Sequence, residues 1–586
     1  MKTLLLSLVL LFSVCALKAT HNRSGEILYK RIAPFSTVTG GVTVPVFTYS
    51  ITLITYTDDG PSIADRCEDT IYFGDGQKAI APRVNFPGTS GSFSNCGCGS
   101  GVGCGNIIMN EANYRVKKNV FSTTHTYSGT GNYIVSFLDP NRNASIVNIP
   151  NSVNQPFYVE ALIMVTNSVV ANTSPNPTNP PIDKGFVSSC FYHNPAAFDA
   201  DGDSISYELM ACNAPGATLP ATGTGGSLGI DARGLMSWCS PQAIGEYNIV
   251  IKMKEWRRSC SDSAYHMIGY VMRDMQMIVG SGSPVPFVPG DLTDTCFVSG
   301  NTLHRSLGSV SSFFSGAALY GVCAYGSQQS ATAITNTVAG TYDFSWPLDC
   351  QLAKHLPQQV VAVYSHNDLS TGTSRYYQHF NVRVLPPAAQ IYSVASTINT
   401  VTIRWHPAPG CSGNISGYNV YRKSGANSWT HGYCQPGLPA ASGYSLVLIG
   451  SVNDSLYNDI YLQPFANGSN MSYIVTTVSS DCQEGVAENP QSVSLVVGIE
   501  QYAQEFLSTS VYPNPSENNF EISFGKILNS TLQITLYAAD GRVVYDAQQK
   551  APGSHVTLNG ADLSAGIYLM RLQTTNGQAY RKLIKE

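Results

Sequence analysis

The chain has 586 residues, with 33 Lys or Arg, 38 Asp or Glu and a net charge of −5. That length has room for about four domains of ~150 residues each. Charged residues make up only 12%, and no basic stripe of the kind that nucleic-acid binding needs is present. The 52 glycines and 32 prolines follow no regular period, which excludes a collagen and a coiled coil, and the apolar content excludes a long disordered chain.

Residues 1–19 form a predicted secretory signal peptide. A lysine precedes the apolar run Leu4–Val14, which is shorter than the ~20 residues that span a bilayer. Ala16 and Ala19 both suit cleavage. A lipid anchor on Cys15 is a weaker interpretation, because a valine stands before it where a small residue is wanted. No later segment reads as a membrane helix, so we expect an exported protein without a transmembrane segment.

Fourteen cysteines remain after the signal peptide, and an even number in an exported chain predicts up to seven disulfides. A metal knuckle over 96–104 is the weaker alternative, because no His or second Cys pair follows at zinc spacing. The expected regions 283–387 and 388–498 hold three cysteines each, so we expect either one bridge across Leu385–Pro387 or a shifted boundary. The disulfide candidates are Cys67, Cys96, Cys98, Cys104, Cys190, Cys212, Cys239, Cys260, Cys296, Cys323, Cys350, Cys411, Cys434 and Cys482.

Apolar and polar residues alternate with a period of two along most of the mature chain. Clear examples are Phe47–Leu53, Val401–Trp405 and Phe520–Phe524, which read as half-buried strands. Turn residues recur about every ten positions, as in stacked β-sandwiches. The predicted fold class is all-β: tandem immunoglobulin-like β-sandwich domains with a small C-terminal β-sandwich.

Stretches rich in Pro and polar residues divide the chain into regions. Two of the regions, around Trp238 and Trp346, look like diverged relatives about one immunoglobulin-like sandwich apart. The expected regions are 20–182, 183–282, 283–387, 388–498, a linker at 499–508, and 509–586.

The first region carries Ile71–Gly76, His125–Tyr127 and Gly131–Tyr133, and through these motifs it resembles a PKD-type domain. A long Cys/Gly-rich insertion separates the motifs, which departs from the family pattern. In the same region, residues 20–26 and 137–142 resemble the opening domain of large surface proteins from gliding bacteria.

The middle regions resemble other extracellular modules. Phe198–Ile205 resembles cadherin-like repeats, so 183–282 is expected to be cadherin- or Ig-like. Region 283–387 is expected to be Ig-like. Region 388–498 resembles fibronectin type III through its Trp405 strand and Gly417–Tyr421.

Four ordered motifs mark the C-terminal region 509–586. Val511–Pro515, Leu536–Val543, Leu563–Leu569 and Arg581–Ile584 resemble the type A C-terminal sorting domain of the type IX secretion system. The resemblance implies that the machinery at the outer membrane is a partner and that the protein passes through the periplasm to the cell surface or the medium. The motif residues are Tyr512, Pro513, Asn514, Pro515, Gly541, Arg542, Gly566, Tyr568, Arg581 and Lys582.

The best candidate for a bound ion is the run Asp199-Ala-Asp201-Gly-Asp203. Carboxylates at alternate positions suit a hard cation such as calcium. The run is not an EF-hand, because Met210 stands where the bidentate glutamate is required. The alternative is that Asp and Gly simply shape the turn into the next strand. Calcium is the one cofactor suggested, and none is required.

No catalytic residue is predicted. Gly225–Gly229 matches Gly-x-Ser-x-Gly, but a loop precedes it where a nucleophile elbow needs a strand. We therefore expect a non-enzymatic, multi-domain cell-surface protein with an adhesive or structural role and an unidentified surface, glycan or protein ligand. The alternative is a secreted glycan-binding protein or a hydrolase with accessory β-sandwich domains.

Overall fold

The computed structural model describes residues 22–58, 66–85, 106–111, 114–167, 172–261, 263–282, 293–307, 316–320, 335–338, 341–368, 372–397, 400–408, 410–411, 413–425, 429–460, 469–495, 506 and 508–586. The predicted signal peptide, Cys96, Cys98, Cys104, Cys323 and most of the predicted linker lie outside these residues.

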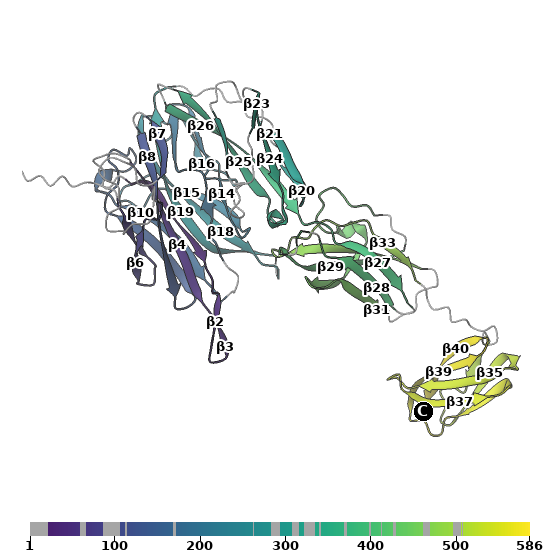
Figure 1. The fold of residues 1–586 in the computed structure, drawn as a ribbon. Coiled ribbons are helices and arrows are strands. Elements are labelled where there is room, and N and C mark those ends of the chain that lie inside the picture. Colours follow the sequence, from purple (N-terminus) through teal and green to yellow (C-terminus); the bar gives the residue numbers. More distant parts are fainter. Residues whose placement is uncertain are drawn as a thin grey trace, which may run out of the picture.

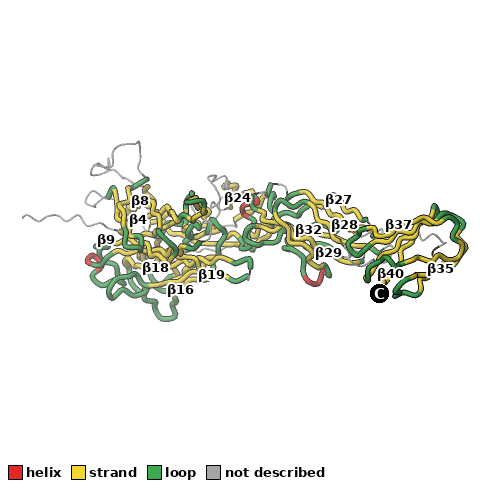
Figure 2. Tube along the Cα trace, turned by 90° about the horizontal axis from the view of Figure 1, so that it is seen from below, coloured by secondary structure: helices red, strands yellow, loops and turns green. Residues whose placement is uncertain are grey.

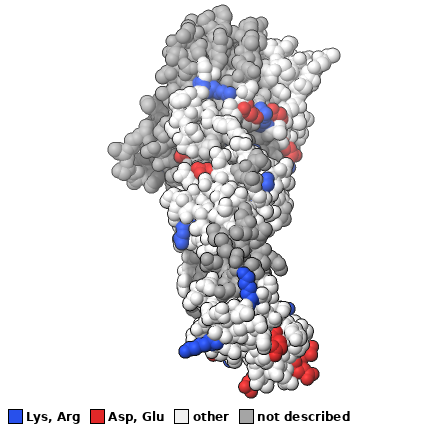
Figure 3. All heavy atoms as spheres, turned by 90° about the vertical axis from the view of Figure 1, so that its right-hand side faces the viewer, with Lys and Arg blue, Asp and Glu red and all other residues white. Residues whose placement is uncertain are grey.

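The described part of the chain is built from strands (Figure 2), which confirms the all-β fold class. Its helical segments are 3-10 turns of three residues each, at Ser152–Asn154, Cys350–Leu352 and Ala440–Ser442. None of its helices has the length and apolar character needed to cross a membrane. On the face drawn in Figure 3, charged side chains are sparse.

A 12-stranded sheet dominates the N-terminal part. Its central strand is β19 (Tyr265–Gly280), which pairs with four neighbours, one of them in parallel. The main path is β6 (Lys78–Pro82), β5 (Glu68–Tyr72), β9 (Gly131–Asp139), β10 (Phe157–Val165), β19, β1 (Asn22–Arg31), β4 (Phe47–Asp58), β8 (Tyr114–Tyr127) and β7 (Asn106–Glu111). The branches are β12 (Ile182–Phe186), β18 (Gly245–Arg258) and β15 (Ser204–Met210).

Strand β19 connects two regions that the sequence separates at residue 182. It pairs with β1 and β10 on one side of that point and with β12 and β18 on the other. Three small sheets complete this part, and one of them is a hairpin that protrudes from the main sheet (Figure 1). They are β2 (Ser36–Thr39) with β3 (Val42–Pro45), β11 (Asn176–Pro177) with β14 (Ala197–Phe198), and β13 (Cys190–His193) with β17 (Met236–Cys239) and β16 (Leu228–Ile230).

The next two regions each contain a pair of sheets, and their hydrophobic residues form one continuous cluster that includes Trp346 and Trp405. The first pair is β20 (Thr295–Val298), β26 (Gly372–Leu385), β25 (Gln358–Asp368) and β22 (Gly316–Tyr320), with β21 (Thr302–Leu307), β24 (Thr341–Pro347) and β23 (Thr335–Val338). The second pair is β27 (Gln390–Ser396), β28 (Thr400–His406) and β31 (Leu456–Ile460), with β30 (Ser445–Ser451), β29 (Ile415–Ser424), β32 (Asn470–Ser479) and β33 (Gln491–Ser494).

The C-terminal module is a sandwich with its own hydrophobic core, which includes Phe520, Leu536 and Leu572. One sheet consists of β34 (Ser510–Tyr512), β35 (Asn519–Leu528) and β38 (Gly553–Asn559). The other consists of β37 (Val543–Gln549), β36 (Leu532–Tyr537), β39 (Gly566–Thr574) and β40 (Gly577–Lys585).

Disulfides tie the middle regions together. Three bridges, Cys260–Cys482, Cys296–Cys434 and Cys350–Cys411, cross the point at Leu385–Pro387, where we expected one bridge or a shifted boundary. Cys260–Cys482 joins the segment after β18 to the segment after β32, and Cys190–Cys239 joins β13 to β17. Cys67 is disulfide-bonded as well.

The structure differs from the sequence expectation at Cys212, which is a free, buried thiol. Its neighbours in the hydrophobic cluster are apolar and include Ile146, Val250 and Met272, with no second cysteine among them. Burial raises the pKa of this thiol to about 12.

Candidate metal centre and sorting module

The three predicted ligands, Asp199, Asp201 and Asp203, lie on one tight loop between β14 and β15. The Oδ1 atom of Asp199 accepts hydrogen bonds from the backbone N–H groups of Asp201 at 2.8 Å and Asp203 at 3.1 Å. Gly202 has a φ of +88°, a conformation that glycine adopts readily. A Cβ atom there would lie 2.9 Å from Cδ of Lys354. The loop therefore has the turn geometry expected from its Asp and Gly residues.

A fourth carboxylate, that of Glu255, joins the three aspartates. One carboxylate oxygen from each of the four residues lies within 4.8 Å of the others. Glu255 is on β18, in register with Ile205 of β15 and Gly269 of β19. It is fully buried, and Asp199 is only 6% exposed. The structure thus brings the predicted residues together and adds a ligand that sequence reasoning missed.

The position of Glu255 left a signal in the sequence. On β18 the side chains of Ile251 and Met253 are buried and alternate with the partly exposed Lys252 and Lys254. Glu255 continues this inward row. A glutamate at an inward position is expensive unless it has a partner, so the alternation alone could have marked it.

One cation, Arg257, faces the cluster directly. Its guanidinium donates to Asp203 at 2.5 Å and lies 3.6 Å from Asp201. It also donates to Asn172 at 2.7 Å, and Asn172 in turn donates to Oε2 of Glu255 at 3.2 Å. Four carboxylates and one guanidinium leave an excess of buried negative charge.

This excess appears in the pKa values. Burial, followed by the nearby Asp203 and Asp201, raises the pKa of Asp199 to about 8. Burial and the charges of Asp199 and Asp203 raise the pKa of Glu255 well above its usual range. Burial is also the largest cause of the raised pKa of Asp201. The cluster therefore attracts either protons or a cation.

One oxygen of Glu255 points to the second outcome. Oε2 accepts hydrogen bonds from Tyr29 at 3.3 Å and Asn172 at 3.2 Å. Oε1 is buried and has no hydrogen-bond partner among the described residues. A buried carboxylate oxygen without a donor is costly, and an oxygen-only ligand set suits a hard cation such as Ca²⁺.

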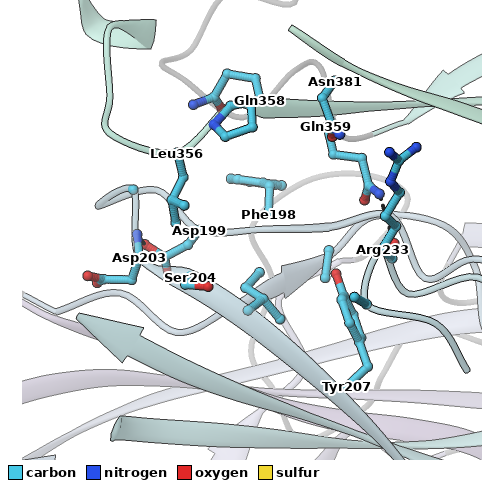
Figure 4. A pocket seen from close by; sticks show the side chains of 15 residues that line it. Phe198, Asp199, Asp203, Ser204, Tyr207, Arg233, Leu356, Gln358, Gln359 and Asn381 are labelled. Carbon is cyan, nitrogen blue, oxygen red and sulfur yellow. Dashed lines mark hydrogen bonds between the residues drawn. The ribbon is translucent and has the colours of Figure 1, made fainter. Parts of the chain in front are cut away.

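Two cavities flank the loop 199–203. Figure 4 shows the smaller, of about 240 Å³, which Asp199 and Asp203 line together with Gln358 and Gln359 of the next region. The larger, of about 360 Å³, is lined by Asp201, Trp256, Tyr265, Lys354 and Asp481, among others. The acidic cluster therefore lies at a junction of three expected regions.

The serine of the Gly-x-Ser-x-Gly match lacks the structural context of a nucleophile. Ser227 is followed directly by the short strand β16. A nucleophile elbow requires a strand before the serine and a helix after it.

In the C-terminal module, the first and last motifs meet. The amide of Asn514 donates to the carbonyl of Lys582 at 2.7 Å and accepts from the N–H of Ile584 at 2.8 Å. The guanidinium of Arg581 donates to the carbonyl of Phe506 at 2.9 Å and to that of Thr509 at 3.2 Å. The basic C-terminal strand β40 thus binds the segment through which the chain enters the module.

The remaining motif residues have mixed environments. Tyr568 is buried, and its hydroxyl donates to the carbonyl of Ser564 at 2.7 Å. Gly541 takes a φ of +82° in the turn before β37. Tyr512 is 64% exposed. The other motif residues are Pro513 and Pro515 beside Asn514, Gly566 at the start of β39, and the exposed Arg542 and Lys582.

Comparison with known proteins assigns the C-terminal module. Residues 510–586 match the family described as the secretion system C-terminal sorting domain, Por_Secre_tail. No curated protein matches the chain. Among solved structures, the FN1-FN3 domains of chicken CNTN1 match at 14% identity over 42% of this chain and 79% of that chain, with a TM-score of 0.16. The all-β fold class follows from the strands described above.

Residues 510–586 therefore belong to the secretion system C-terminal sorting domain family, and the chain is a type IX secretion cargo that is exported across the outer membrane to the cell surface or the medium.

Proposed function

We propose that the chain is a non-enzymatic surface protein with an adhesive or structural role, and that a calcium ion held by Asp199, Asp201, Asp203 and Glu255 stiffens the junction between its β-sandwich regions. The single observation that carries the calcium site is the buried, unpartnered Oε1 of Glu255 beside three aspartates. The sorting module, the β-sandwich regions and the bridges between them support the surface role.

Calcium acts here by replacing protons. A divalent ion neutralises carboxylates that otherwise repel each other in a buried site, and waters in the flanking cavities complete its six to eight oxygen ligands. The loop 199–203 contacts the next region through Lys354, whose ammonium donates to the carbonyl of Asp201 at 3.4 Å. Fixing this loop therefore fixes the contact between the two regions.

The test is thermal unfolding of the mature full-length chain in calcium and in a chelator. At a free calcium concentration of 100 times Kd, binding adds about 2.7 kcal/mol to the free energy of unfolding. Asp199→Asn should lose this increment. Glu208→Gln is the matched control, because Glu208 lies on the neighbouring strand and pairs with Lys254 at 2.7 Å outside the cluster. Equal melting in calcium and chelator would leave only the turn interpretation.

Screening of the same protein against peptide and glycan substrates tests the non-enzymatic role. We expect no turnover. Turnover that disappears when a single carboxylate or Ser227 is replaced would establish an exported hydrolase instead.

Glycan binding is a second candidate function, favoured by the larger cavity. Trp256 and Tyr265 line it beside Asp201 and Lys354, and aromatic faces next to polar groups suit the two chemical sides of a sugar ring. A glycan array probed with the mature chain and with Trp256→Ala tests it. Binding that the variant loses supports this function, and an array without a hit removes it.

A further inference from the structure

The solvent-facing side of the four-stranded sheet in the sorting module has a polar end and an apolar end. On β39, Tyr568, Met570 and Leu572 are buried. Since side chains alternate along a strand, Ile567 and Leu569 point outward, and they are 54% and 47% exposed.

Strand register extends this apolar character across the sheet. Tyr537 on β36 lies directly opposite Leu569 on β39 and Val543 on β37. Val543 is 50% exposed. Ile567 lies opposite Ile584 on β40. We call these five residues, Val543, Tyr537, Leu569, Ile567 and Ile584, the apolar row.

The opposite end of the same face is polar. Gln533 pairs with Gln548 and with Gln573, and Gln573 pairs with Gln578, so four glutamines span the four strands. The level between the two ends holds Asp546, Thr535, Arg571 and Tyr580. One end of this face is therefore apolar and the other end is polar.

The second sheet of the module has no matching row. On its described face Glu521 lies opposite Thr557, and Ser523 lies opposite His555. Its exposed Tyr512 pairs with the polar Glu521, so the apolar side chains there stand singly. Scattered apolar residues are ordinary on a protein surface, whereas a contiguous row marks an interaction site.

Two cations flank the apolar row. Lys582 is exposed and lies opposite Leu569. Arg571 lies over the ring of Tyr537, 5.8 Å from its centroid, and donates to Thr535 at 3.2 Å. Neither cation forms an ion pair with any described residue. A partner that covers the row gains most if it supplies carboxylates at these two positions.

From this charge pattern and the sorting-domain match, we propose that the apolar row is the face through which the sorting module docks onto a protein of the outer-membrane export machinery, one with an apolar ridge flanked by acidic residues. A second copy of the chain fits less well. Two copies of this face together bring four cations and two carboxylates, and each copy's Asp546 already accepts from Gln533 at 3.1 Å and Thr535 at 3.0 Å.

The experiment replaces residues on this face in the full-length chain and measures surface delivery in a bacterium with the type IX system. Leu569→Asp should reduce the amount at the surface about tenfold, the effect of losing one anchor of an interface, and the protein should accumulate in the periplasm. Lys582→Glu should also reduce delivery. Gln573→Asp is the matched control, because it adds the same charge to the same strand and face at the polar end.

Folding is checked separately. The retained protein is purified from the periplasm, and protease resistance of its sorting module is compared with that of the parent chain. Leu569→Thr, which keeps a residue suited to strands, should also reduce delivery while the module stays resistant. Normal delivery of folded Leu569→Asp would overturn the proposal, as would equal loss with Gln573→Asp. A concentration-dependent dimer of the parent chain that Leu569→Asp dissociates would assign the row to self-association instead.

Discussion

Glu255 and Asp199 hold carboxylate oxygens within 4.8 Å of each other, although one lies near the C-terminal end of a long strand and the other on a loop. Both are buried. Burying either carboxyl group alone costs little stability if the group is protonated. Together the two groups form a site whose charge depends on whether protons or a cation bind there.

Replacing Glu255 should have opposite effects with and without calcium. In a chelator, the raised pKa of Glu255 means that folding must protonate this carboxyl group or bury its charge. Glu255→Gln avoids that cost, so the free energy of unfolding at pH 7 should rise by about 1–3 kcal/mol. In calcium, the variant should lose most of the stabilisation that the ion gives. Chemical denaturation under both conditions measures this. A variant that is destabilised in the chelator would show that Glu255 has a purely structural role.

A buried histidine should make the contact between the second and third regions sensitive to acid. His193 is fully buried; its Nδ1 lies 3.2 Å from Asp183 and 3.3 Å from the hydroxyl of Tyr377 on β26. Burial is the largest cause of its lowered pKa, which Asp183 partly opposes and Arg273 and Arg375 reinforce.

The sign follows from proton uptake. The folded state binds fewer protons at His193 than the unfolded state does, so stability falls as pH drops below the unfolded pKa of about 6.5. Denaturation between about pH 7 and pH 5 should show this loss, and His193→Gln should reduce its slope. An unchanged slope in the variant would place the acid sensitivity elsewhere.

A buried ion pair connects the first expected region to the second. The guanidinium of Arg273 on β19 donates to Glu26 on β1 at 2.8 Å and to the carbonyl of Pro177 at 2.9 Å. Both side chains are essentially without solvent contact. Glu26→Gln should therefore cost about 3–5 kcal/mol of stability, because it leaves an uncompensated buried cation.

The control for this pair is a double replacement. Glu26→Leu with Arg273→Met should recover most of the loss, since well-packed apolar groups often replace a buried pair at little cost. If the double variant is no more stable than Glu26→Gln, the hydrogen bonds of Arg273 matter more than the pair.

The sequence motifs anticipated part of this arrangement. Residues 20–26 and 137–142 stand far apart, yet Asn22 donates to Asp139 at 2.6 Å, and Arg142 pairs with Asp274 of β19 at 2.5 Å. Sequence reasoning connected the two motifs by resemblance. It did not find β19, because a strand with buried Arg273 and Asp274 violates the rule that core positions are apolar, and only distant partners satisfy those charges.

Local sequence patterns were sufficient to predict those strands and turns whose structure depends on residues close in sequence. The alternating segment Phe47–Leu53 lies within β4, Val401–Trp405 within β28 and Phe520–Phe524 within β35. The aspartate loop was also local. Glu255 and the partners of the cysteines depend on how strands from different regions pair, which spacing alone does not determine.

The disulfide Cys260–Cys482 should hold the second region against the fourth. Replacing both cysteines with serine should cost about 2–5 kcal/mol and should open the cavity that Asp481 and Tyr265 line. The other two bridges that cross Leu385–Pro387 remain, so the third and fourth regions should stay joined. Limited proteolysis resolves the two effects: new cuts near residue 260 without release of the fourth region are expected, and an unchanged pattern would show that packing alone holds the junction.

Surface delivery of a chain truncated before residue 510 tests the central claim most directly, because the assignment as a type IX cargo rests on residues 510–586. Protease added to intact cells should digest the full-length protein, whereas the truncated protein should be protected in the periplasm with its other regions folded. Truncated protein that reaches the surface at normal levels would contradict the sorting assignment and, with it, the account of where this protein works.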